Sequence, residues 1–152
     1  MKLRASEVLE LARKARDRSL PLYLRGRDLS GLGLYKADLG GADLSETDLT
    51  KTNLAASNLG GAILSGATLV EAELTGARLE GADLTHANLA EANLSQADLR
   101  RASLFEAHLP GTNLDHADLS GADLRGARYD AYTRWPITFD PEAAGAILVV
   151  ST

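Results

Sequence analysis

Leucine returns at every fifth position of this sequence from Leu29 to Leu124, which gives 20 leucines in unbroken phase. Leu24 and Tyr129 extend the series by one position at either end. Asp or Asn stands directly before the leucine in 13 of these 20 repeats, and a small residue stands two positions before it in nearly all of them. A period of five fits neither an α-helix, with 3.6 residues per turn, nor a long β-strand, with a period of two.

This pattern predicts a short extended piece followed by a corner. In an extended segment the leucine and the small residue point to one side, and the Asp or Asn between them points to the other. The two remaining residues must turn the chain, and glycine occupies the second position after the leucine in nine repeats. Glycine there suits the positive-φ position of a type II turn. Repetition without loss of phase winds the chain into a coil with leucine and alanine inside and polar residues outside.

Segments such as Ala42–Glu46, Ala87–Glu91 and Ala122–Gly126 follow the pattern A-(D/N)-L-x-x. In this respect the sequence resembles the pentapeptide-repeat family. The resemblance implies an all-β fold, a right-handed quadrilateral parallel β-helix with four pentapeptides per coil. On that basis the repeats make about five coils, which stack at about 4.8 Å into a rod roughly 25 Å long.

The N-terminal segment predicts a helix over about residues 6–18. Its apolar residues fall on one helical face: Val8, Leu11, Ala12 and Ala15. Ser6 suits an N-cap, and Ser19–Leu20–Pro21 suits a stop. Basic residues lie mostly off that face: Arg13, Lys14, Arg16 and Arg18. The helix is interpreted either as a cap on the first coil or as a membrane- or partner-docking element. The cap is favoured because an uncovered end coil would aggregate.

Next to this helix the first coil is imperfect, since Arg27 and Leu32 occupy positions of the small residue. We expect Arg27 to turn toward solvent.

The C-terminal segment predicts a second cap. Four of the seven aromatic residues fall within residues 129–139: Tyr129, Tyr132, Trp135 and Phe139. Asp140–Pro141–Glu142 predicts the start of a short helix through Ala144, followed by the apolar run Ala146–Val150. Large rings are a simple way to cover exposed leucines. The segment forms a cap, a dimer interface or both, since the gyrase-binding members of the family pair through their C-terminal ends.

We therefore divide the chain into an N-terminal capping helix (1–20), a β-helix (21–131) and a C-terminal cap (132–152), all in one folding unit. A homodimer through the C-terminal end is compatible with this division.

The net charge of −5 conceals an asymmetry, because residues 1–27 carry +5 and residues 28–152 carry −10. With four repeats per coil, acidic residues concentrate on two neighbouring faces. The face centred on Leu44, Leu64, Leu84, Leu104 and Leu124 has an expected net charge of −4, and the face of the Leu29 series one of −3. Ile63 and Phe105 project from the first of these faces. The candidate partner contacts are therefore Ile63, Phe105, Glu106, Asp43, Asp83 and Asp123.

The sequence offers little for catalysis or cofactor binding. It has no cysteine, and its three histidines, His86, His108 and His116, fall on three different outer faces. Asp98 and Asp118 stack one coil apart, but the neighbouring arginines (Arg78, Arg100 and Arg101) favour ion pairs over calcium, which needs six to eight oxygen ligands. We expect no catalytic residues, no metal and no cofactor.

These observations predict a non-enzymatic protein-binding or scaffold protein whose partner is unknown. The alternative is a DNA-mimicking regulator of DNA gyrase or another type II topoisomerase, as in the quinolone-resistance members of the family. Two faces with seven net charges over about 25 Å reach about half the charge density of a DNA duplex. The acidic body disfavours direct nucleic-acid binding. Without an apolar run of about 18 residues or a signal peptide, we expect a cytoplasmic protein that does not enter a membrane.

Overall fold

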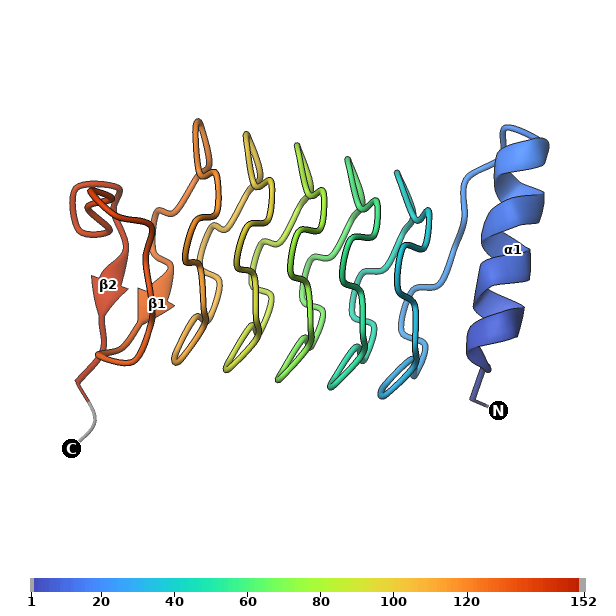
Figure 1. Ribbon diagram of the computed structural model, residues 1–152, viewed down its shortest axis with the longest axis horizontal. Helices are drawn as coiled ribbons and strands as arrows, with labels where there is room; N and C mark the ends of the chain where they lie inside the picture. Colours follow the sequence, from blue (N-terminus) through green and yellow to red (C-terminus); the bar gives the residue numbers. More distant parts are fainter. Residues whose placement is uncertain (1, 151–152) are drawn as a thin grey trace.

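The computed structural model describes residues 2–150. Its one helix, α1 (Ala5–Asp17), lies across one end of a stack of rectangular coils, and strands β1 (Arg128–Tyr129) and β2 (Ile147–Leu148) lie at the other end (Figure 1). The chain between them climbs from coil to coil in one direction, so the two termini lie at opposite ends of the molecule.

Neighbouring coils pair with a register of 20 residues. The residue before each leucine forms a parallel bridge with its equivalent 20 positions later, as in Asp43–Ile63 and Asp83–Ser103. Backbone hydrogen bonds follow the same register, and the Leu44 N–H donates to the Ile63 carbonyl at 2.7 Å. Twenty residues are four pentapeptides, so each coil has four sides. Each side is straight for only two or three residues, which is why bridges replace long strands.

The corners are tight turns, as predicted. At a typical corner the Thr47 N–H donates to the Leu44 carbonyl at 3.2 Å, and Glu46 between them has a φ of +57°. The second residue after the leucine has a positive φ in every repeat from Gly26 to Gly126, in ten cases as glycine and in eleven as another residue. These eleven residues adopt a conformation that costs an L-amino acid about 1–2 kcal/mol, so coil stacking must hold them there.

The Asp and Asn residues before the leucines stabilise the corners. In all 13 repeats the side-chain Oδ1 accepts a hydrogen bond from the backbone N–H two residues later. The Asn58 side chain and the Gly60 N–H show this arrangement at 3.1 Å. Such local hydrogen bonds are the reason that Asp and Asn favour turns. The Glu73 carboxylate likewise accepts a hydrogen bond from the Thr75 N–H.

Leucine and alanine fill the interior of the coils. The leucines of the series are at most 1% exposed except for Leu119, at 7%. Threonine at the small position adds a hydrogen bond to this core, because the Thr52 hydroxyl donates to the Leu29 carbonyl at 2.9 Å. Thr47 and Thr112 do the same. Ser57 is equally buried, but its hydroxyl has no partner within residues 2–150.

Helix α1 begins one residue earlier than expected, and Ser6 is not its N-cap. The cap is Arg4, whose backbone N–H donates to the Glu7 carboxylate at 2.7 Å. Val8 and Ala12 pack on the first coil at 0% and 7% exposure. Leu11 was expected on this face, but it lies at its edge and is 41% exposed.

In this first coil Arg27 is exposed, as expected, and Leu32 is half-buried.

Beyond Tyr129 the coil continues with one extra residue. Asn113 pairs with Arg134, a separation of 21, so that Trp135 takes the place of a leucine. The Asp130 carboxylate closes the widened corner by accepting hydrogen bonds from the backbone N–H groups of Gly111, Tyr132 and Thr133.

β1 then pairs in parallel with β2. The short helix expected through Ala144 is wrong. Asp140 does accept a hydrogen bond from the Ala143 N–H, but only one hydrogen-bonded turn forms before Gly145, at a φ of +90°, redirects the chain.

Candidate protein-binding surface

Four of the six candidate partner contacts lie on one straight line down the molecule. Residues 23, 43, 63, 83, 103 and 123 bridge one another in succession, and we name this row the 43–123 ladder. Asp43, Ile63 and Asp83 are three consecutive rungs of it. Ile63 is 42% exposed, so its side chain stands in solvent between the two carboxylates.

The carboxylates of Asp43 and Asp83 accept hydrogen bonds but form no ion pairs among residues 2–150. Asp43 Oδ1 accepts hydrogen bonds from the Ser45 hydroxyl at 2.5 Å and the Ser45 backbone N–H at 3.0 Å, and both hold the pKa of Asp43 below its usual value. Asp83 accepts a hydrogen bond from the Thr85 N–H. Within residues 2–150 neither carboxylate forms an ion pair within 4 Å. This part of the ladder therefore presents two carboxylates without an ion-pair partner beside an apolar side chain, and the nearby charge of Arg25 also lowers the pKa of Asp43.

The C-terminal part of the same face differs, because Arg125 occupies it. Its guanidinium contacts Asp123 through two hydrogen bonds of 2.8 and 2.9 Å, which lower the pKa of Asp123 to about 2. The same guanidinium lies over the ring of Phe105, 5.7 Å from its centroid. His86 also packs edge-on against that ring, with centroids 6.1 Å apart, and contacts Glu106 at 3.2 Å. Phe105 is thus half-buried by its neighbours, and the charge of Asp123 is partly compensated by Arg125.

The expected net charge of this face needs a correction. Arg25 belongs to it and pairs with Glu46 at 2.7 Å. Counting Arg25 with Arg125 against five carboxylates gives −3 where −4 was expected. The 20-residue register places Arg125 and Phe105 at neighbouring positions of this face, whereas the contact between them also depends on their side-chain rotamers.

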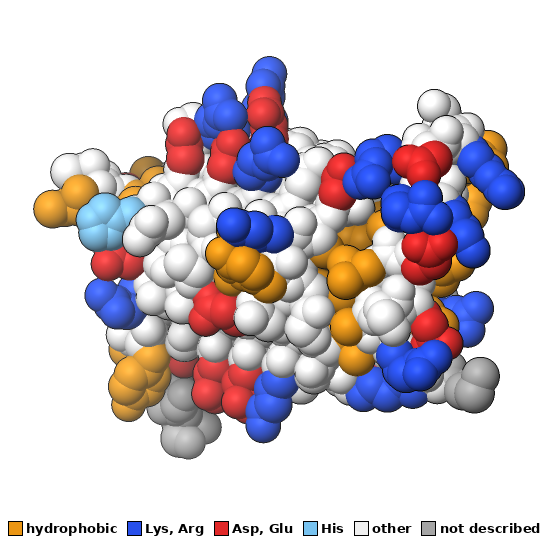
Figure 2. Space-filling model, turned by 45° about the vertical axis from the view of Figure 1, so that its right-hand side comes forward, with side chains coloured by type: hydrophobic (Ala, Val, Ile, Leu, Met, Phe, Trp, Pro, Cys, Tyr) orange, Lys and Arg blue, Asp and Glu red, His pale blue; other side chains and the backbone are white. Residues whose placement is uncertain are grey.

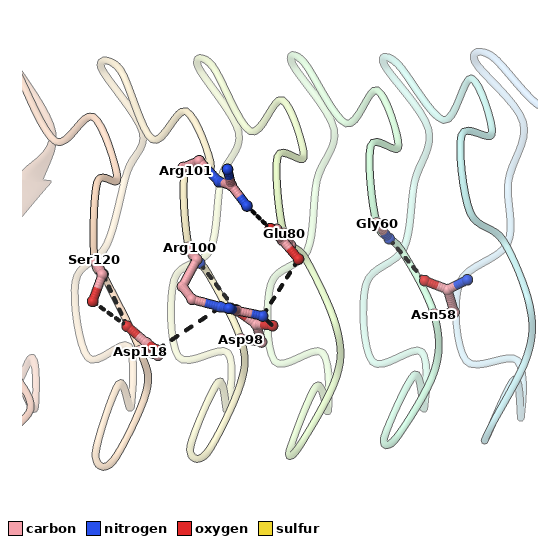
Figure 3. Close-up of polar contacts among 8 residues, drawn as sticks. All are labelled: Asn58, Gly60, Glu80, Asp98, Arg100, Arg101, Asp118 and Ser120. Atoms are coloured by element: carbon pink, nitrogen blue, oxygen red, sulfur yellow. Dashed lines mark hydrogen bonds and ion pairs between the residues drawn. The ribbon is translucent and has the colours of Figure 1, made fainter.

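The face of the Leu39 series holds a network of ion pairs (Figure 3). Arg100 contacts Asp98 at 2.7 Å, Glu80 at 3.4 Å and Asp118 at 3.9 Å. Arg101 also contacts Glu80. The Arg100 guanidinium lowers the pKa of Asp98, while hydrogen bonds from Ser120 lower that of Asp118.

The preference for ion pairs at Asp98 and Asp118 is therefore confirmed for Arg100, whereas Arg101 pairs with Glu80 and Arg78 forms no ion pair within residues 2–150. No three His, Asp or Glu side chains of residues 2–150 come together as a metal site would require.

Three of the four C-terminal aromatic residues cover the last coil. Trp135 packs edge-on against Tyr129 with ring centroids 5.3 Å apart, and it stacks on Phe139 at the same distance. Tyr132 instead points into solvent at 79% exposure. Exposed apolar side chains also flank the free edge of β2: Ile147, Leu148, Val149 and Val150.

None of the helices in residues 2–150 is long and apolar enough to cross a membrane.

Comparison with known proteins agrees with this architecture. The family model for pentapeptide repeats matches in eight copies over residues 33–69, 67–104 and 97–128. Among solved structures, HetL, a pentapeptide repeat protein involved in heterocyst differentiation regulation from the cyanobacterium Nostoc sp. strain PCC 7120, is 33% identical. The alignment covers 90% of this chain and 57% of HetL, with a TM-score of 0.67. The chain thus spans little more than half the length of HetL.

Two further structures match more weakly. The pentapeptide repeat protein alr5209 from Nostoc PCC 7120 is 29% identical over 96% of both chains, with a TM-score of 0.49. QnrB1, a plasmid-mediated fluoroquinolone resistance protein, is 16% identical over 86% of this chain and 83% of its own, with a TM-score of 0.39, a similarity too low to bear on function. No curated protein gives a match. With its repeats matched over most of their length, the chain belongs to the pentapeptide-repeat family of right-handed β-helices.

Proposed function

We propose that this protein is a non-enzymatic binding or scaffold protein that contacts a partner protein along the 43–123 ladder. The observation that supports this most directly is the exposed Ile63 between the carboxylates of Asp43 and Asp83, neither of which forms an ion pair within residues 2–150. An apolar anchor with charged neighbours can supply both affinity and orientation to a protein contact. Phe105, Glu106 and Asp123 extend the contact as secondary positions, because neighbouring side chains already engage them.

The relationship to HetL is compatible with this proposal. HetL is involved in regulating differentiation, and regulation by a repeat protein commonly rests on its extended surface. We extend only the class of role, a regulatory protein contact, to this chain.

A photo-crosslinking residue in place of Ile63 tests the proposal in cells of the source organism. The matched control replaces Arg78, which also precedes a leucine and is exposed but lies on the face of the Leu39 series. We expect a discrete protein adduct at position 63 that is absent at position 78 and is lost when Asp43→Asn and Asp83→Asn are added. Equal adducts at both positions, or none at position 63, would reject the ladder as the binding surface.

We further propose that about five coils and their two ends form one folding unit, with residues 1–20 as one cap, 21–131 as the β-helix and 132–152 as the other cap. Of these ranges, residues 1, 151 and 152 lie outside the described part of the chain. Support comes from Val8 and Ala12 on the first coil and from the Tyr129–Trp135–Phe139 cluster on the last.

A homodimer through Tyr132 and the free edge of β2 is a separate proposal. It is supported by the exposed apolar side chains there. Sedimentation velocity should show a dimer that Leu148→Asp converts to a monomer. A wild-type protein that stays monomeric at about 100 µM, a concentration at which a dimer with a Kd of about 100 µM (about 5.5 kcal/mol) forms in part, would contradict it.

The DNA-mimic alternative is weakened by the pairing of Glu46 and Asp123 with arginines. Inhibition of gyrase supercoiling by the purified protein would restore it.

A further inference from the structure

The first coil carries a free β edge beneath helix α1. Its four bridging residues, at positions 23, 28, 33 and 38, pair with the next coil on one side only. In every later coil the equivalent N–H donates to the coil before it, as Asp43 N–H does to the Leu22 carbonyl at 2.8 Å. Within residues 2–150, neither the N–H nor the carbonyl of Asp38 has a hydrogen-bond partner in the backbone. The interior of an α-helix cannot supply one, because its backbone groups are satisfied within the helix, and no backbone group at the end of α1 reaches Asp38.

Helix α1 leaves a cavity open at the Asp38 part of this edge. The cavity has a volume of about 320 Å³ and lies between the C-terminal half of α1 and the side of the first coil that carries Asp38. Hydrophobic side chains are visible in the space between α1 and the coils (Figure 2). The walls include small residues, among them Ala12, Ala15 and Gly40, together with Leu22 and Leu39. The space is therefore partly apolar and bordered by unpaired backbone.

Arg16 and Asp38 stand at the rim of this cavity. Their side chains form an ion pair of 3.3 Å, yet they are 56% and 43% exposed. An exposed ion pair of this kind stabilises by no more than about 1 kcal/mol. Arg16 can therefore exchange Asp38 for another carboxylate at little cost.

We propose that this cavity binds an extended peptide segment of a partner protein. The segment adds one rung before Asp38, at the 4.7–4.9 Å spacing of paired strands, and forms hydrogen bonds with the free N–H and carbonyl of Asp38. Because side chains alternate along an extended chain, apolar residues face Leu22 and Leu39 and the residue between them faces solvent. A carboxylate of the segment, from an acidic side chain or a chain end, binds Arg16. This site is independent of the 43–123 ladder.

Unpaired backbone is the feature that selects this occupant. A helix or a folded surface could not satisfy the Asp38 N–H and carbonyl, and a small apolar molecule would leave them unpaired, which costs about 1–3 kcal/mol per buried group. An extended chain satisfies both groups and needs little width, which fits the alanine and glycine lining.

The test begins with phage-displayed random hexapeptides that carry free C-termini, selected on the full chain. Counter-selection uses Ala15→Leu, which places a larger side chain in the cavity. Ala143→Leu, at an exposed position at the opposite end of the molecule, is the matched control. Thermal unfolding followed by circular dichroism verifies that both variants fold. We expect enriched sequences with apolar residues at alternate positions, bound at least tenfold more weakly by Ala15→Leu and unchanged by Ala143→Leu.

A synthetic copy of the enriched hexapeptide then locates the contact. Its binding should slow hydrogen exchange of the Asp38 amide at least tenfold. N-methylation of the central peptide bond should abolish binding. Amidation of the peptide C-terminus and substitution of its acidic side chain distinguish the two sources of the carboxylate, since the change that removes the bound carboxylate weakens binding. In Arg16→Ala that same change should no longer affect binding.

Three results would overturn the proposal. These are a selection that enriches nothing over Ala15→Leu, an N-methylated peptide that binds within twofold of its parent, and amide protection at β2 instead of Asp38. Failure of the crosslink at Ile63 leaves this test untouched, so the two proposals can fail separately.

Discussion

The middle of the coil stack and its two ends solve the same problem in different ways. In the middle, each leucine is covered above and below by equivalent leucines, and each backbone group that points along the axis meets a partner 19–21 residues away. At the ends the repeat has no further copy of itself to stack on. The N-terminal end uses the small side chains of a helix, and the C-terminal end uses stacked aromatic rings. Repetition alone therefore stabilises the middle, whereas each end needs a separate arrangement that leaves apolar groups exposed.

The largest expected effect comes from the middle. Leu79→Ala removes a side chain that is 0% exposed, in a coil that neighbouring coils hold on both sides. We expect a loss of about 3 kcal/mol in the free energy of unfolding, since the rigid coils cannot collapse around the cavity. Urea denaturation measures it. Leu148→Ala, at a position 45% exposed at the end, should cost less than about 1 kcal/mol. Equal losses would remove the distinction between middle and end.

The contact of α1 with the first coil should contribute less. Val8 is 0% exposed, and Val8→Ala deletes about two methyl groups from its side chain. Helix α1 contacts the coils on one of its sides only. We expect a loss of about 1.5 kcal/mol by urea denaturation. Leu9→Ala, at 40% exposure on the same helix, is the control and should stay within about 0.5 kcal/mol. A Val8→Ala effect no larger than that of Leu9→Ala would mean that α1 does not act as a cap.

Two polar residues of the core in the middle coils differ in whether their hydroxyl group has a hydrogen-bond partner, and their substitutions should differ in effect. Thr52→Ala removes a hydrogen bond to the Leu29 carbonyl and should cost about 1 kcal/mol. Ser57→Ala removes an equally buried hydroxyl that has no partner within residues 2–150, so it should be neutral or stabilising. Differential scanning calorimetry of both variants compares them. If Ser57→Ala is as costly as Thr52→Ala, the Ser57 hydroxyl donates a hydrogen bond in solution.

The strained corners allow a small gain in stability. Gln96 has a φ of +59° and is exposed. Gln96→Gly relieves about 1 kcal/mol of strain, offset in part by the greater freedom of glycine in the unfolded chain. We expect a net gain of about 0.5 kcal/mol in thermal denaturation. In Gln96→Ala the residue still has a positive φ and keeps the backbone strain, so we expect no gain in stability.

The smallest effect is electrostatic. Arg125 lowers the pKa of Asp123 to about 2, whereas an unfolded aspartate has a pKa of about 3.9. A carboxyl whose folded pKa is lower stabilises the fold above about pH 4 and loses that contribution as the pH falls toward 2. Wild type should therefore exceed Asp123→Asn in stability at pH 6 and match it near pH 2 in urea denaturation. A gap that does not change with pH would contradict the role of the Arg125 ion pair.

The sequence predicts the regular part of this molecule well, for a physical reason. A five-residue period leaves the chain one way to bury every leucine, and so the coil, the positive-φ corners and the solvent-facing Arg27 all followed from it. The structure also explains why Asp and Asn precede the leucine, since their side chains accept hydrogen bonds from the backbone N–H groups of the corners. These hydrogen bonds were not predicted from the sequence, because the outward orientation of Asp and Asn already accounts for their polarity.

The detailed structure of the two ends could not be predicted in this way, because no sequence repeat constrains them. The Arg4–Glu7 cap of α1 depends on backbone geometry at one turn, and the extra residue between Tyr129 and Thr133 depends on how Asp130 folds back on three N–H groups. On the candidate surface, the ladder of Asp43, Ile63 and Asp83 was predictable from the 20-residue spacing. The pairing of Phe105 and Asp123 with Arg125 depends on side-chain rotamers, which spacing does not determine.

The coil register has a consequence for how such a chain can change its length. Removal of residues 61–80 would join Gly60 to Gly81, which occupies the same place in its turn as Gly61, and every later residue would keep its side and its depth. A loss or gain of any number that is not a multiple of 20 would rotate the remainder of the molecule, so that the rungs of the 43–123 ladder before and after the change would no longer lie on one line. Gene segments encoding whole coils can therefore be duplicated or lost as exchangeable units, and the length of the binding surface can vary without redesign of either end.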